Sequence, residues 1–125
     1  MSGRRILLVD DSPTHRSLIT VFLRGNDYEF VEAGTGLEGL QAIDRGHIDL
    51  VIADINMPEM DGVSFIRRVR RSRDPKVRDL PIILLTAEKA AGRMEEGLRA
   101  GANECLRKPV SNAGIAEVVA RHLGP

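Results

Sequence analysis

Residues 49–62 read DLVIADINMPEMDG, and this stretch decides the fold. An apolar run ends on an acid, Asp54, and a loop that carries Pro58 and the pair Asp61-Gly62 follows it. A continuous apolar run of this length is typical of a strand that is buried on both faces, as in a parallel sheet. In open α/β sheets, ligands bind at the carboxyl ends of the strands. We therefore predict that Asp54 is the functional carboxylate and that the other elements position it.

The sequence on both sides of this stretch alternates between strand and helix patterns. Strands are expected at residues 6–9, 28–33, 48–53, 80–85 and 104–107. A helix is expected after each strand, because apolar residues recur there at three- and four-residue spacing; examples are Leu18, Leu37, Phe65, Leu98 and Val118. This strict alternation predicts one α/β domain, in which five helices cover both faces of a five-stranded parallel sheet.

The ends of three helices can be read from capping residues. Ser12 and Ser111 are expected to cap the first and the last helix. The pair Asp74-Pro75 is expected to end the third helix. Gly92 and Gly97 interrupt the fourth helix, which makes it the weakest of the five by helix propensity.

The composition is typical of a folded globular protein. The 125 residues are 42% apolar and 29% charged, and the 18 basic and 18 acidic residues cancel. A balanced charge gives no overall field that would attract nucleic acid or lipid. No apolar run approaches the roughly 20 residues of a membrane-spanning helix, and we expect no signal peptide. The single cysteine excludes an internal disulfide. We therefore expect a soluble cytoplasmic domain.

Polar groups of different kinds end four of the predicted strands. Asp10 and Asp11 follow the first, Asp54 the third, Thr86 the fourth and Lys108 the fifth. These ends converge on one edge of a parallel sheet, where three carboxylates would repel one another unless a divalent cation bound. Oxygen ligands without a His or Cys cluster suit Mg²⁺ or Mn²⁺. A carboxylate nucleophile, a hard metal and a lysine are typical of phosphoryl transfer through an aspartyl phosphate.

These residues resemble the receiver domain of bacterial two-component response regulators, the family of the chemotaxis regulator. The resemblance rests on Asp10-Asp11, on Asp54 in an acid-x-x-Met-Pro-x-Met-Asp-Gly context, on Thr86-Ala87 and on Lys108-Pro109. It covers essentially the whole chain, so residues 1–125 would form one receiver domain with no separate output domain. The family fold is flavodoxin-like, with strand order 2-1-3-4-5.

The resemblance implies a phosphorylation site and a metal site. Asp54 would accept a phosphoryl group from a histidine kinase or a small phosphodonor. Asp11 and Asp54 would bind Mg²⁺ through their side chains and Asn56 through its backbone carbonyl, while Asp10 would act through a bound water. The chain would be a phosphoacceptor switch that loses its phosphate by its own hydrolysis, rather than an enzyme with a separate substrate.

The resemblance also implies how the phosphoryl group is held. Lys108 would form an ion pair with it, and the Lys108–Pro109 peptide bond would be cis. Thr86 would move to donate a hydrogen bond to a phosphoryl oxygen, and the backbone amide of Ala87 would contact the group as well. In this family, the positions of Asn56 and Glu88 tune the rate of hydrolysis, and their polar and acidic side chains here predict a short-lived phosphate.

Two residues depart from the family pattern. Cys105 stands where the family usually has Tyr or Phe, whose ring turns inward when the threonine moves, and Val110 stands where Phe is common. A side chain as small as that of cysteine cannot fill and vacate a pocket of that size. The residues of the active site match the family pattern, whereas the conformational change that a partner protein recognises is expected to differ from that of a standard receiver. By resemblance, the fourth helix, fifth strand and fifth helix would contact the downstream protein.

Alternative functions remain at this point. One is a receiver-like interaction module that is never phosphorylated, although such modules usually lose an acid or the lysine. Another is a metal-dependent phosphatase that uses an aspartyl phosphate, but those enzymes carry an Asp-x-Asp pair where this chain reads Asp10-Asp11-Ser12. The arginine-rich segment 67–78 could bind an acidic protein, although a solvated outer helix face is the favoured interpretation because no aromatic residues are interleaved.

Overall fold

The computed structural model describes residues 3–87 and 91–124, and its core is a five-stranded parallel sheet. The strands are hydrogen-bonded in the order β2-β1-β3-β4-β5, which confirms the predicted topology. Their bounds are β1 Arg4–Val9, β2 Tyr28–Ala33, β3 Leu50–Asp54, β4 Ile82–Thr86 and β5 Glu104–Arg107. Every residue of β3 and of β4 is buried, as expected for central strands of a sheet that is covered on both faces.

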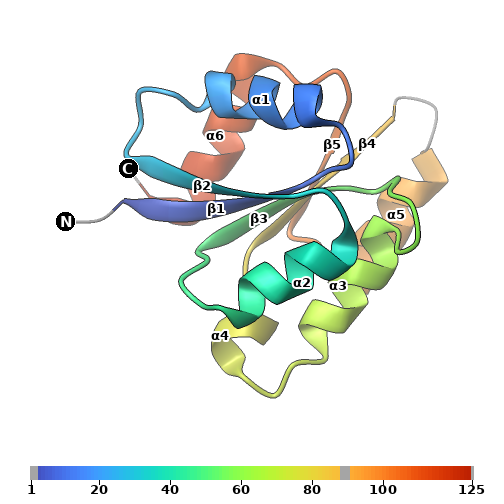
Figure 1. Cartoon of the computed structure of the whole chain (residues 1–125). Coiled ribbons are helices and arrows are strands. Elements are labelled where there is room, and N and C mark those ends of the chain that lie inside the picture. The colour runs from blue at the N-terminus through green and yellow to red at the C-terminus, as the bar shows by residue number, and fades with distance from the viewer. Residues whose placement is uncertain (1–2, 88–90, 125) are drawn as a thin grey trace.

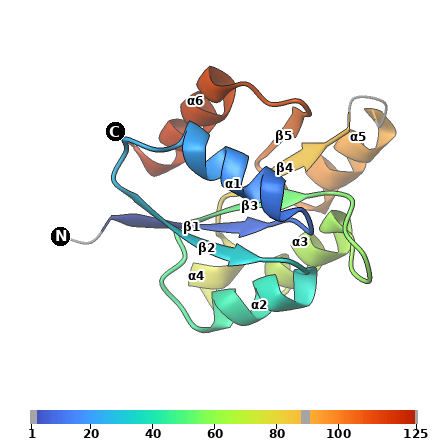
Figure 2. The same ribbon diagram turned by 45° about the horizontal axis from the view of Figure 1, so that its top comes forward.

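Helices lie on both faces of this sheet (Figures 1 and 2). One face carries α1 and α6, and the other carries α2 and α3. The helix bounds are α1 Pro13–Phe22, α2 Gly36–Asp44, α3 Gly62–Arg70, α4 Pro75–Arg78, α5 Ala91–Ala100 and α6 Asn112–Leu123. The hydroxyls of Ser12 and Ser111 accept hydrogen bonds from the first turns of α1 and α6, as the sequence predicts. None of the described helices is long and apolar enough to cross a membrane.

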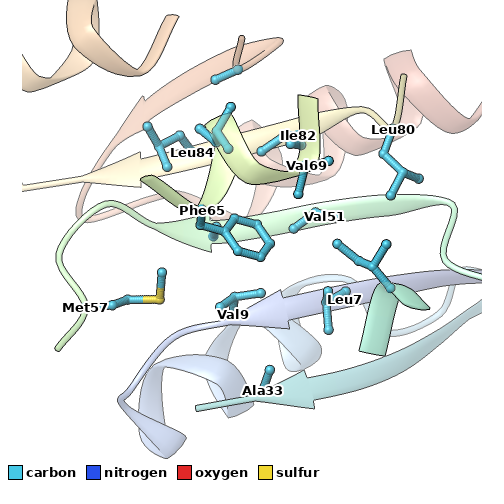
Figure 3. Packing of buried hydrophobic residues seen from close by; sticks show 14 of the residues in the cluster. Leu7, Val9, Ala33, Val51, Met57, Phe65, Val69, Leu80, Ile82 and Leu84 are labelled. Carbon is cyan, nitrogen blue, oxygen red and sulfur yellow. The ribbon is translucent and has the colours of Figure 1, made fainter. Parts of the chain in front are cut away.

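Successive side chains of each strand alternate between two hydrophobic clusters, one on each face of the sheet. Leu7 and Val9 of β1 pack with Phe65 of α3 in the first cluster, whereas Ile6 and Leu8 pack with residues of α1 and α6 in the second. Figure 3 shows the Phe65 ring above the strands, close to Val9 and Val51. The buried strands β3 and β4 thus need apolar residues on both faces, which is why their sequence runs are almost continuously apolar.

The structure corrects two of the sequence predictions. Asp74-Pro75 does not end α3, which ends at Arg70; instead, Asp74 caps a further short helix, α4, whose first residue is Pro75. Proline suits that position because its fixed φ is helical and it needs no backbone donor there. The second error concerns apolar residues that were expected to face the core but are exposed: Leu18, Leu37 and Leu98. In α2 the buried face instead carries small residues, among them Gly36, Gly39 and Ala42.

Arg70, in the last turn of α3, hydrogen-bonds to residues near the amino-terminal ends of β4 and β5. These ends lie opposite the carboxyl ends of the strands, where Asp54 and Thr86 are found. The guanidinium of Arg70 donates hydrogen bonds to the backbone oxygens of Arg78, Leu80 and Gly101 and to Oδ1 of Asn103, at 2.7–3.0 Å. These acceptors lie just before β4, just after α5 and just before β5. Burial lowers the pKa of Arg70, but arginine keeps its charge in proteins. The other basic residues of segment 67–78 are exposed, which agrees with a solvated outer face.

Helix α5 packs closely on β4 because Gly97 faces the strand. A Cβ atom at Gly97 would lie 2.3 Å from Cδ2 of Leu84, a distance that real side chains do not reach. Gly92, the second residue of the same helix, has open space around it. Gly97, which lowers the helix propensity of α5, is therefore also the residue that lets the helix approach β4.

Candidate functional site

The carboxyl ends of the strands bring together residues that are far apart in the sequence. Asp10 follows β1 directly, Asp54 is the last residue of β3 and Thr86 is the last residue of β4. Lys108 follows β5. The parallel register places these ends at the same edge, with Val9 beside Ala53 and Asp54 beside Leu85. The sheet alone therefore assembles the predicted site.

Three carboxylates form the centre of this site. One oxygen atom from each of Asp10, Asp11 and Asp54 lies within 4.8 Å of the other two. Asp10 and Asp54 are each only 5% exposed, whereas Asp11 is exposed. A cluster of carboxylate oxygens without nitrogen or sulfur donors fits the preference of Mg²⁺ for oxygen ligands, and its open side leaves room for waters. The residues present therefore fit a hard divalent cation.

Both carboxylate oxygens of Asp54 are engaged. Oδ2 forms an ion pair with Nζ of Lys108 at 2.5 Å, and Oδ1 accepts a hydrogen bond from the backbone N–H of Asn56 at 3.0 Å. The exposed Asn56 side chain lies in the loop that leads to α3. That loop folds back on the strand at Gly62, where a Cβ atom would lie 2.8 Å from the backbone oxygen of Asp54. The Asp-Gly pair therefore lets the loop close against the site.

Asp10 has a partner for each of its polar groups. Its backbone N–H donates to the oxygen of Ala33, and Arg16 donates to its backbone oxygen. Its side-chain oxygen Oδ1 accepts from the N–H of Ser12 at 2.9 Å, and Oδ2 contacts Nδ1 of His15. Asp11, by contrast, makes no side-chain hydrogen bond within the described ranges 3–87 and 91–124.

Thr86 is fully buried, and its hydroxyl has no hydrogen-bond partner among the described residues. Buried polar groups are nearly always paired, so the unpaired Thr86 hydroxyl is an exception, and it is available to form a hydrogen bond with a group that binds at this strand end. Ala87 follows it and is exposed. Glu88, the residue expected to tune hydrolysis together with Asn56, lies outside the described residues.

The residues around Lys108 complete the site. The Lys108–Pro109 peptide bond is cis, and the backbone N–H of Lys108 donates to the oxygen of Thr86 at 2.7 Å. Cys105 lies beside Leu84 in the register of β4 and β5 and packs against the cluster that contains Phe65. Burial raises the pKa of the Cys105 thiol. Cys105 therefore behaves as a small, half-buried apolar residue.

The sequence predictions missed two side chains that contact the site. His15 and Arg16 lie in the first turn of α1 and both contact Asp10, and Arg16 also pairs with Glu32 of β2 at 2.8 Å. The three histidines of the chain are scattered in the sequence, so no ligand spacing marks His15. The available signal was its place in the first turn of a helix that starts at the acid pair.

Comparisons with known proteins agree with this geometry. The family model described as "Response regulator receiver domain" matches residues 6–120. Sensor protein EvgS of Escherichia coli (strain K12) is 41% identical over 106 residues, which cover 85% of this chain and 8% of that protein. Chemotaxis protein CheY-3 of Vibrio cholerae is 33% identical over 114 residues, which cover 90% of this chain and 86% of CheY-3.

A solved structure shows the same fold with a metal ion. The receiver domain of sensor histidine kinase PA1611 from Pseudomonas aeruginosa PAO1, which has a magnesium ion coordinated in its active site cleft, matches with a TM-score of 0.87. Its sequence is 32% identical, and the match covers 98% of this chain and 99% of that one. The chain is thus as long as a single receiver and spans only a small part of the sensor proteins that it matches. It belongs to the response regulator receiver domain family of two-component signalling systems.

Proposed function

We propose that this receiver is a phosphoacceptor switch, in which Asp54 takes a phosphoryl group from a histidine kinase in a Mg²⁺-dependent reaction. The observation that carries the proposal is the position of Asp54, which is buried between Lys108 and the acids Asp10 and Asp11. A carboxylate oxygen of Asp54 attacks phosphorus while the bond to the histidine nitrogen of the donor breaks. Later, a water attacks the same phosphorus, the bond to Asp54 breaks, and inorganic phosphate leaves.

The chain's own residues divide the work of holding the cation. Asp11 and Asp54 would bind Mg²⁺ through carboxylate oxygens and Asn56 through its backbone carbonyl, while Asp10 would act through a bound water. The contacts of the two neighbouring acids support this division, because Asp10 is fixed by partners and Asp11 is free to turn towards an ion. When bound, Mg²⁺ neutralises the charge that the carboxylates and the phosphoryl oxygens bring together.

Lys108 and Thr86 respond to the phosphoryl group. Lys108 already contacts Oδ2 of Asp54, so it can pass to a phosphoryl oxygen with a small movement. The unpaired hydroxyl of Thr86 gains a partner when it donates to another phosphoryl oxygen. The amide of Ala87 contacts the same group, and Asn56 and Glu88 set the lifetime of the phosphate. The expected short lifetime stays a prediction.

The conformational change is read by a protein partner. We place the contact surface on α5, β5 and α6, the elements that follow Thr86 in the chain and of which β5 carries Cys105. Because Cys105 has no ring to turn inward, the movement of Thr86 acts on this surface through the packing of α5 on β4. The assignment of residues 1–125 to one receiver domain, and its location in the cytoplasm, stay predictions.

The proposal is tested by intact mass after incubation with acetyl phosphate, with and without Mg²⁺. The wild type is expected to gain one phosphoryl group when Mg²⁺ is present, and Asp54→Asn is expected to gain none. Glu59→Gln is the matched control, because it removes an exposed acid from the same loop and leaves Asp54 in place. A wild type that stays unmodified with both acetyl phosphate and a phosphorylated kinase would favour the interaction module.

A further inference from the structure

The first turn of α1 is built around the side chain of Asp10, and His15 supplies its most direct contact. We propose that His15 is a positioning residue for the cation site: by holding Oδ2 of Asp10, it fixes the carboxylate that faces the cation and so sets the affinity for Mg²⁺. This inference rests on the proposed function, because it concerns the same cation.

The contacts of Asp10 show why one residue matters so much. The N–H of Ser12 holds Oδ1 at 2.9 Å and His15 holds Oδ2, so the carboxylate cannot rotate without losing both contacts. The Asp10 side chain is 7% exposed, which leaves it little water to replace a lost partner. Each carboxylate oxygen has a second lone pair, so a held oxygen can still accept a hydrogen bond from a metal-bound water.

The chemistry also fixes the form of the imidazole. An ionised carboxylate only accepts hydrogen bonds, so Nδ1 of His15 must carry the proton and donate it. His15 itself is held in place, because its backbone N–H donates to Oγ of Ser12 at 3.2 Å and its side chain is only 18% exposed.

Residues that hold metal-binding groups commonly change metal affinity by about 10- to 100-fold when they are replaced. His15→Leu keeps a side chain of similar size but removes the donor, so it is expected to weaken Mg²⁺ binding by at least about 10-fold. His15→Asn is the rescue variant, because its amide nitrogen lies as many bonds from Cα as Nδ1 does. We expect it to bind Mg²⁺ within about 3-fold of the wild type.

His122 provides a matched control. It also contacts a carboxylate, that of Glu104 at 3.0 Å, and its side chain is 20% exposed, but it lies on α6 and has no contact with the three acids. His122→Leu is therefore expected to bind Mg²⁺ as the wild type does. Urea unfolding of each variant without Mg²⁺ shows that the proteins compared are folded.

The experiment is a calorimetric titration of each variant with MgCl₂ at pH 8, where an ordinary imidazole is neutral. The proposal is overturned if His15→Leu binds as tightly as the wild type, or if His15→Asn is as weak as His15→Leu. If the wild type binds no Mg²⁺, the proposed function loses its metal and this inference fails with it. If the wild type binds Mg²⁺ and His15→Leu binds it equally tightly, this inference fails and the proposed function stands.

A spectroscopic measurement tests the geometry without any metal. Long-range ¹H–¹⁵N spectra at pH 8 distinguish which ring nitrogen of a histidine carries the proton. We expect the proton of His15 on Nδ1, the nitrogen that faces Asp10, whereas free imidazole side chains prefer the other tautomer. A bare Nδ1 at His15 would contradict the proposed contact, whatever the titrations show.

Discussion

At the scale of single residues, Arg70 is the side chain whose replacement should cost the most stability outside the core. Its guanidinium satisfies backbone oxygens at the ends of several elements, and no other side chain presents donors in that planar fork. We expect Arg70→Ala to lower the free energy of unfolding by about 3 kcal/mol, because the abandoned oxygens are partly buried. Arg70→Lys is expected to recover less than half of that loss. Urea unfolding measures both.

The control for this prediction comes from the same helix. Arg68 is exposed and makes no ion pair within residues 3–87 and 91–124, so Arg68→Ala should change stability by no more than about 0.5 kcal/mol. Equal losses for Arg68→Ala and Arg70→Ala would show that the hydrogen bonds of Arg70 contribute nothing specific.

Cys105 gives a prediction that depends on pH. Because burial raises its pKa in the folded protein, the folded state carries less thiolate than an unfolded chain at any pH between the two pKa values. The thiol should therefore react with a disulfide reagent more slowly in the native protein than in urea, and its rate should keep rising with pH beyond the ordinary thiol pKa, where the rate of the unfolded chain levels off. The same shift favours the folded state below that ordinary pKa, and this contribution is lost as the pH rises through the folded value.

This measurement is simple because Cys105 is the single cysteine of the chain. Cys105→Ser gives the background rate. A native protein that reacts as fast as the unfolded one across the whole pH range would mean that the thiol is freely accessible, and the packing assigned to β5 would have to be revised.

At the scale of elements, the two glycines of α5 should respond to alanine in opposite directions. Gly97→Ala puts a Cβ against Leu84 of the buried β4, so it should destabilise the protein by about 1–3 kcal/mol. Gly92→Ala meets no atom and raises helix propensity, so it should stabilise by up to about 1 kcal/mol. Thermal unfolding of the pair distinguishes a packing role from simple flexibility, since flexibility alone would make both variants more stable.

The elements also show what the sequence could predict. All five predicted strands lie within two residues of the observed bounds. Continuous apolar runs located β1, β3 and β4, because a strand buried on both faces leaves no polar position, whereas β2 was located by its alternating pattern. The three- and four-residue spacing of apolar residues wrongly placed Leu37 in the core, because α2 packs on the sheet through Gly36 and Gly39 and leaves Leu37 exposed to solvent. Helix α4 was missed because Pro75 was interpreted as the end of α3, although α3 ends at Arg70 and Pro75 is the first residue of a separate helix.

The site was predictable wherever topology alone decides proximity. The acids, Thr86 and Lys108 all follow strands, and parallel strands carry their ends to one edge. His15 and Arg70 were not predictable, because their roles depend on the direction of a side chain from a helix. Arg70 stands among exposed arginines in the sequence, and only its place in the last turn of α3, beside the buried Val69, distinguishes it from them.

At the scale of the whole molecule, the carboxylate cluster should make stability depend on divalent cations. Without metal, the three acids repel one another, so Asp11→Asn is expected to raise the melting temperature. With Mg²⁺ at about ten times its dissociation constant, the wild type should gain about 1.4 kcal/mol by mass action, whereas Asp11→Asn should gain little. Calorimetric melts with and without Mg²⁺ measure both effects.

Glu59→Gln serves as the control here too, and it should respond to Mg²⁺ as the wild type does. An Asp11→Asn protein that is stabilised by Mg²⁺ to the same extent as the wild type would place the cation somewhere other than this cluster.

The hydrogen bonds of Arg70 have a consequence for folding kinetics. They join residues that are 31 and 33 positions apart in the sequence, across α4, β4 and α5. Contacts that close long loops form only after the intervening elements are in place. Arg70→Ala should therefore leave the refolding rate nearly unchanged in stopped-flow experiments and accelerate unfolding. Arg70 would then determine how long the native state lasts, while the buried strands determine how quickly it forms.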